Sequence, residues 1–67
     1  MQKAKLIQEI LQKEFSKKAV LQGEVIKISV KSINSFGILC LYRLTMYHFC
    51  IIELKRSGSG ITILATF

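Results

Sequence analysis

The 67-residue chain contains no proline and no aspartate, and it has only two cysteines, Cys40 and Cys50. Two cysteines are too few for a disulfide framework. The N-terminus also lacks the short apolar core and small-residue cleavage site of a secretory leader. We therefore expect a reducing, cytoplasmic setting, in which both cysteines act as small buried apolar residues.

The chain has no aspartate, so the acidic residue nearest to the single histidine, His48, in the sequence is Glu53. Glu53 is five residues away and off the helical face of His48, which limits the chemistry available to the histidine. His48 and the two cysteines give at most three soft metal ligands, whereas a tetrahedral site needs four. The chain has neither paired carboxylates nor the GxxxxGK[ST] pattern of a phosphate-binding loop. These absences predict a protein without enzymatic activity, metal or cofactor.

Acidic residues are scarce, since four glutamates stand against ten lysines and arginines and give a net charge of +6. A charge of this sign makes polyanions such as nucleic acid or acidic lipid the natural partners. The side chains predicted to contact nucleic acid are Lys27, Lys31, Arg43, Lys55 and Arg56. An alternative is that the basic residues form a solvated surface and serve only solubility.

The chain is short for its apolar content, because 51% of its residues are hydrophobic. A domain of this size buries only about 60% of the surface of its unfolded chain and is marginally stable alone. The apolar surplus predicts a surface that is covered by another molecule. Self-association and membrane insertion are both consistent with this surplus.

Two different periodicities divide the first half of the chain. Apolar residues recur at helical spacing over residues 2–17 and predict an amphipathic helix. Apolar and polar residues then alternate over residues 24–31, as in a half-buried strand. Gln22 and Gly23 predict a hairpin turn between this strand and a short strand over residues 19–21.

Residues 35–54 are mostly apolar and contain no proline, asparagine or aspartate that would mark a hairpin. Twenty residues exceed the usual length of a strand, so the segment is predicted to be one long helix. Ser32, Asn34 or Ser35 would cap its start, and Gly58 would end it, with Lys55 and Arg56 near the negative end of the helix dipole. The stripe predicted to pack on the sheet is Ile33, Phe36, Cys40, Leu44, Tyr47, Ile51 and Leu54.

Residues 57–60 alternate serine and glycine and predict a flexible link to a final strand over residues 61–67. The predicted order of elements is αββαβ. A helix between two strands can cross over one face of a sheet, which predicts a two-layer α+β fold in one small domain covering residues 1–67.

The order of elements after residue 20 resembles the truncated KH-like core of the DciA-like bacterial replicative helicase loader family. The strand pattern that carries the resemblance is Gly23, Val25, Ile26, Ile28, Val30 and Ser32. A helix and a short closing strand follow, and the resemblance covers residues 21–67. It implies contact with single-stranded nucleic acid or with a replication protein. KH domains grip the nucleic-acid backbone with a GxxG loop, and this chain contains none.

Three functional hypotheses follow from the sequence. The first is a small basic module that binds nucleic acid or a nucleic-acid-associated protein and self-associates through residues 35–54. The second is a small membrane protein in which residues 35–54 span the bilayer, although Arg43 near the middle opposes insertion. The third is a structural or regulatory homo-oligomer without a polyanion ligand.

Overall fold

A computed structural model describes residues 2–67 of the chain. Its elements are α1 (Gln2–Phe15), β1 (Val20–Gln22), β2 (Val25–Val30), α2 (Ser35–His48), β3 (Ile51–Ser57) and β4 (Gly60–Thr66). The α+β fold class is confirmed, and the order αββαββ contains one strand more than predicted.

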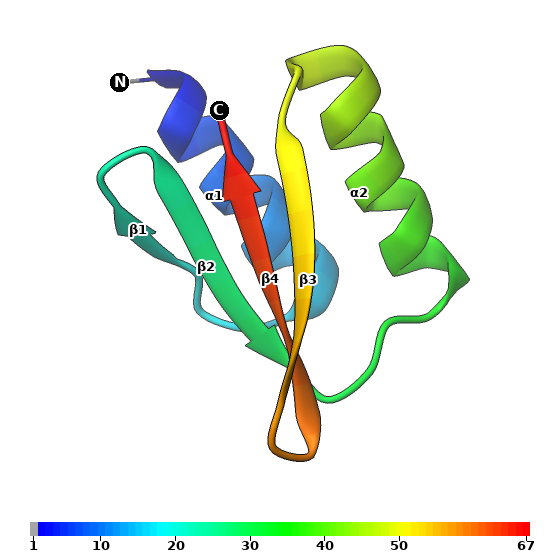
Figure 1. Cartoon of the computed structure of the whole chain (residues 1–67). Helices are drawn as coiled ribbons and strands as arrows, with labels where there is room; N and C mark the ends of the chain where they lie inside the picture. Colours follow the sequence, from blue (N-terminus) through cyan, green and yellow to red (C-terminus); the bar gives the residue numbers. More distant parts are fainter. Residues whose placement is uncertain (1) are drawn as a thin grey trace.

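The four strands form one antiparallel sheet in the order β1-β2-β4-β3 (Figure 1). Since β4 is antiparallel to both of its neighbours, β2 and β3 run parallel to each other. The unit β2-α2-β3 is therefore a split βαβ crossover with β4 inserted between its two strands. The helix between the strands lies on one face of the sheet, as the sequence predicted.

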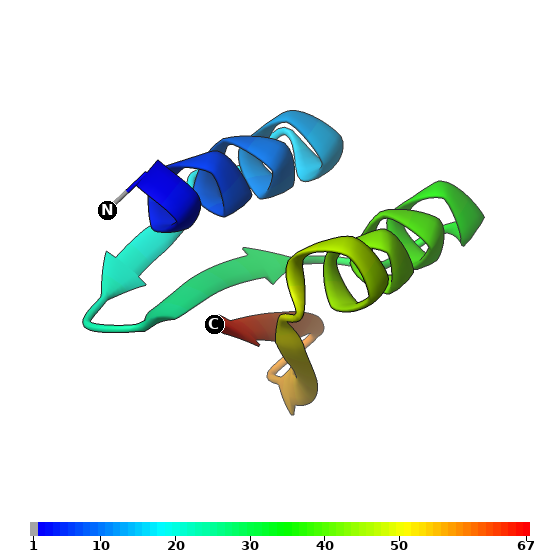
Figure 2. The same cartoon turned by 90° about the horizontal axis from the view of Figure 1, so that it is seen from above.

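Both helices lie on the same side of the sheet, so the molecule has two layers (Figure 2). Alternation along β2 turns Ile26, Ile28 and Val30 toward the helices, where they are buried. They form one core with buried residues of α1, α2 and β4, among them Ile7, Leu11, Leu41, Leu44, Ile63 and Ala65. The opposite face of the sheet carries no helix.

The first half of the chain folds as its periodicities predict. Helix α1 ends at Phe15, within two residues of the predicted boundary. Gly23 has a φ of 62° at the first central position of the β1–β2 turn, where a residue with a side chain would be strained. Gln22 pairs with Val25 across this turn, which confirms the predicted hairpin.

The predicted helix over residues 35–54 is wrong in its second part, because α2 ends at His48. Phe49 adopts the left-handed conformation with a φ of 57°, and its N–H donates to the carbonyl of Leu44. This conformation ends helices at glycine far more often than at phenylalanine, so the stop has no sequence signature. No helix in the described part of the chain combines the length and apolarity needed to cross a membrane.

Strand β3 contains residues 51–54, which the sequence predicted to form the last turns of the helix. Lys55 and Arg56 belong to this strand and not to a helix C-terminus. Gly58 and Ser59 form a two-residue hairpin turn between β3 and β4, so the predicted flexible link is also wrong. The left-handed conformation expected at Gly58 is present, with a φ of 58°, but it serves this turn.

The buried face of α2 differs from the predicted stripe. Gly37, Leu41 and Leu44 face the core, whereas Phe36 is 71% exposed and Tyr47 is 73% exposed. Asn34 caps the helix as one of the three predicted candidates, and its side-chain oxygen accepts the N–H of Gly37 at 2.8 Å. Helix α2 therefore exposes more aromatic surface than a helix buried along the predicted stripe would.

Candidate functional site

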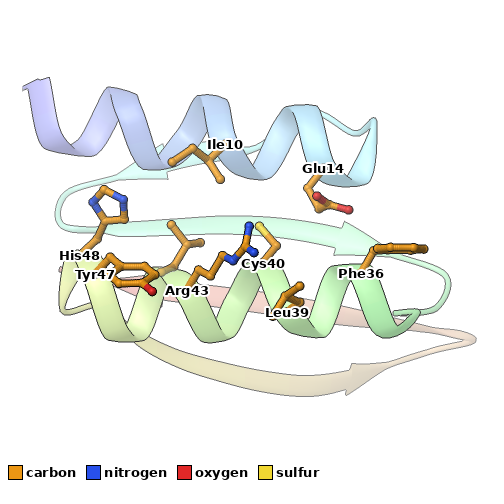
Figure 3. A pocket seen from close by; sticks show the side chains of 9 residues that line it. Ile10, Glu14, Phe36, Leu39, Cys40, Arg43, Tyr47 and His48 are labelled. Atoms are coloured by element: carbon orange, nitrogen blue, oxygen red, sulfur yellow. The ribbon is translucent and has the colours of Figure 1, made fainter.

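The five predicted nucleic-acid contacts lie in three separate places. Lys31, Lys55 and Arg56 lie at the end of the sheet that contains the β3–β4 turn, with Lys55 and Arg56 on opposite faces because successive residues of a strand alternate. Lys27 lies further along β2, opposite Leu64 of β4. Arg43 projects from α2 into a groove beside α1 (Figure 3). The structure therefore places three of the five predicted residues at one end of the sheet, and only Lys31 and Arg56 of these line a common cleft.

The strand register explains why Lys31 and Arg56 lie near each other. Val30, the last residue of β2, is opposite Ile61, and Ile61 is opposite Arg56. Lys31 follows Val30 directly, and Lys55 precedes Arg56. Neighbouring strands lie about 4.8 Å apart, so β2 and β3 are separated by about 10 Å at this level.

Two further cations, Lys17 and Lys18, lie in the loop between α1 and β1. Val20 pairs with Lys27, so the chain preceding Val20 runs toward the end of the sheet where β2 finishes. Figure 1 shows this loop in the same half of the molecule as the β3–β4 turn, and Figure 2 shows the two separated across the width of the sheet. We call Lys17, Lys18, Lys31, Lys55 and Arg56 together the basic end.

Lys17 and Lys18 were not among the residues that the sequence predicted to contact nucleic acid. Two hydrogen bonds fix the loop that carries them. The amide of Gln8 donates to the carbonyl of Ala19 at 2.7 Å, and the N–H of Ala19 donates to the side-chain oxygen of Gln12 at 3.1 Å. The only sequence signal for this loop was the spacing of Gln8 and Gln12, which are four residues apart. Such a spacing also occurs on any solvated helix, so it did not predict the two hydrogen bonds.

A shallow cleft of about 280 Å³ opens at the basic end. Its lining includes Lys31 and Arg56 on opposite sides and the turn residues Gly58, Ser59 and Gly60. Two cations and a serine hydroxyl around a glycine-rich turn are donors that suit a phosphate oxygen. The cleft can therefore hold an anionic group.

Gly60 lets the backbone close this cleft, because a Cβ atom there would lie 2.6 Å from the carbonyl oxygen of Val30. We expect Gly60→Ala to lower the free energy of unfolding by about 1 to 3 kcal/mol, since the β2–β4 ladder must shift. Thermal unfolding followed by circular dichroism would measure the loss. Ser59→Ala, in the same exposed turn, is the control and should leave the midpoint nearly unchanged. Equal midpoints for Gly60→Ala and the wild type would contradict the close approach.

A second concavity of about 350 Å³ lies between α1 and α2 (Figure 3). Ile10 and Glu14 line it from α1, and Arg43 and Tyr47 line it from α2. Glu14 and Arg43 enter it from opposite walls, with the thiol of Cys40 on the α2 wall between Arg43 and Phe36. Arg43 therefore points toward this groove and away from the basic end.

The groove offers little chemistry of its own. Burial raises the pKa of the Cys40 thiol, Glu14 raises it further, and Arg43 partly offsets the change by lowering it. Burial likewise raises the pKa of Cys50, so neither thiol is activated as a nucleophile. Both cysteines are free. Among residues 2–67, no three histidine, cysteine or acidic side chains group together as a metal site would require.

Comparison with known proteins gave no match, whether to protein-family models, to curated proteins or to solved structures.

Proposed function

We propose that this chain is a small module that binds single-stranded nucleic acid through its basic end. The observation that carries the proposal is the cleft that Lys31, at the end of β2, and Arg56, in β3, line together. All five side chains of the basic end are exposed. Lys17 and Lys18 in the α1–β1 loop and Lys55 in β3 add positive charge outside the cleft, which a chain of phosphates entering it could contact.

The chemistry of the basic end favours contact with the nucleic-acid backbone. Lysine and arginine contacts to phosphate position a nucleic acid without reading its sequence. The cleft between Lys31 and Arg56 offers a site for one phosphate. Lys17, Lys18 and Lys55 extend the positive surface beyond that site. We therefore expect binding with little sequence preference.

An exposed aromatic ring favours single strands over duplexes. Phe36 lies in the first turn of α2, where it lines the groove between α1 and α2, and its ring is 71% exposed. Unpaired bases stack on such rings, with a contribution of about 1 to 3 kcal/mol per base. The resemblance to the DciA-like helicase loaders implies the same class of ligand.

The proposal predicts that Lys31 contributes to binding of nucleic acid and that Lys5 does not. Fluorescence anisotropy of a labelled single-stranded oligonucleotide would measure affinity over a range of salt concentrations. Lys31→Ala should weaken binding and make the slope of log K against log salt shallower by about 0.7, the value for one lost phosphate contact. Lys5→Ala is the matched control. It removes the same charge near the start of α1, away from the basic end.

Three outcomes would overturn the proposal. The first is no binding at low salt, and the second is an equal loss for Lys31→Ala and Lys5→Ala. The third is binding to phosphatidylserine vesicles that exceeds binding to the oligonucleotide, because the ligand would then be an acidic lipid surface. Phe36→Ala separates base stacking from phosphate contacts, since it should lower affinity without changing the salt slope.

A further inference from the structure

The sheet has two edges of unequal length. Strand β1 has three residues, whereas β3 has seven and contains neither proline nor glycine. Six of the seven side chains of β3 are exposed. A long exposed edge is a template for another strand, and proteins normally shorten, cover or charge such edges. Strand β3 is the edge at which a further strand can add.

The hydrogen-bonding pattern shows which backbone groups of β3 are free for such a strand. The N–H of Phe67 donates to the carbonyl of Glu24, so odd-numbered residues of β4 bond to β2 and even-numbered residues bond to β3. The even-numbered residues lie opposite Ile51, Glu53, Lys55 and Ser57. The N–H and C=O groups of Ile52, Leu54 and Arg56 therefore point away from the sheet.

The charges of β3 favour one register for a second copy in antiparallel orientation. When Leu54 lies opposite Leu54, each Glu53 lies opposite Lys55 of the other copy. Centring the pair on Glu53 opposes two glutamates, and centring it on Lys55 opposes two lysines. Centring it on Arg56 opposes two arginines, and centring it on Ile52 leaves Glu53 opposite Ile51. Like charges directly opposite each other are destabilising, whereas opposite charges stabilise a ladder.

Apolar surface flanks the same edge. Leu54 is half exposed, and Ile38, Tyr42 and Phe49 project from the flank of α2 that faces away from the groove with α1. Helix α2 contacts β3, and the chain passes from Phe49 into that strand within two residues. A second copy at the edge would therefore lie next to an apolar surface that this chain leaves uncovered.

We propose that two copies of this chain pair antiparallel through their β3 edges, with Leu54 opposite Leu54, to form one continuous eight-stranded sheet. The pairing joins the free backbone groups of Ile52, Leu54 and Arg56 and sets two Glu53–Lys55 pairs across a twofold axis. Both helical layers then lie on the same side of the sheet. The proposal does not depend on nucleic-acid binding.

Charge reversal tests the register, with molecular mass measured by sedimentation equilibrium. The wild type should show twice the 7.6 kDa of one chain. Glu53→Lys and Lys55→Glu each set like charges opposite one another and should raise the dissociation constant about tenfold or more. An equimolar mixture of the two variants, and the double variant carrying both changes, should regain the dimer. Glu24→Lys, in the other hairpin turn, is the matched control.

Hydrogen exchange supplies a second readout that does not depend on any substitution. The amides of Ile52, Leu54 and Arg56 should gain protection as the protein concentration rises, whereas those of Glu53 and Lys55 are protected at every concentration. A mass of one chain throughout the concentration range would overturn the proposal. A dimer mass that survives both single charge reversals, or unprotected amides at Leu54 in a dimer, would also overturn it.

Discussion

Replacement of Ile63 by alanine is expected to lower the free energy of unfolding by about 2 to 5 kcal/mol. Ile63 is fully buried in the inner strand β4, between Ile28 of β2 and Leu54 of β3. It belongs to the same core as Leu11 of α1, so its removal leaves a cavity between the sheet and the helices. A domain this small rarely has more than about 3 to 5 kcal/mol of stability, and the variant should be largely unfolded.

Leu64→Ala is the matched control for this prediction. Leu64 is the next residue of β4 and is half-buried on the face that carries no helix. Its truncation removes a side chain of the same volume but should cost roughly half as much or less, because less apolar area is lost from the core. Urea unfolding monitored by circular dichroism compares the two variants. Equal losses would mean that both faces of the sheet are covered.

A fourfold rise in salt should weaken single-strand binding by about a hundredfold. Five cations that each neutralise a phosphate give a slope of about −3.5 for log K against log salt, since each contact on a single strand contributes about −0.7. The five side chains are those of the basic end. Anisotropy titrations at several concentrations of potassium chloride would measure the slope.

The measured slope also indicates how many cations contact phosphate groups. Replacement of chloride by glutamate at constant ionic strength is the control for specific anion binding to the protein. A slope near −1 would mean that the five cations do not act together, and it would contradict the contact surface proposed for the basic end. An affinity independent of salt would exclude phosphate contacts as the source of binding.

The first half of the fold and the last strand were predictable because their side chains have a buried side and an exposed side. In residues 51–57, apolar and polar residues do not alternate in this way, so the sequence did not indicate a strand. As an edge strand, β3 has six exposed side chains, so apolar and polar residues need not alternate along it. Its apolar residues Ile51 and Leu54 instead continued the helical spacing of α2. A left-handed phenylalanine, Phe49, separates the two elements, and no residue type announces that break.

The site was predictable only in part, for a related reason. Composition identified cations as the chemically relevant residues, but their grouping depends on strand register. Lys31 and Arg56 come together because Val30 and Arg56 both lie opposite Ile61, a relation between three segments that sequence spacing does not contain. Arg43 was singled out because it interrupts an apolar segment, yet it lies in the groove against α1.

The inner position of β4 has a consequence for the order in which the fold can be completed. This strand follows β2 and β3 in the chain, yet it separates them, pairing with β3 along its whole length and with β2 from Ile61 to Thr66. On a ribosome, α1 and the β1–β2 hairpin can form early, but the sheet cannot close until Thr66 has emerged. Until then β3 has no partner and β2 pairs only with β1, so the nascent chain exposes strand edges that can pair with other chains.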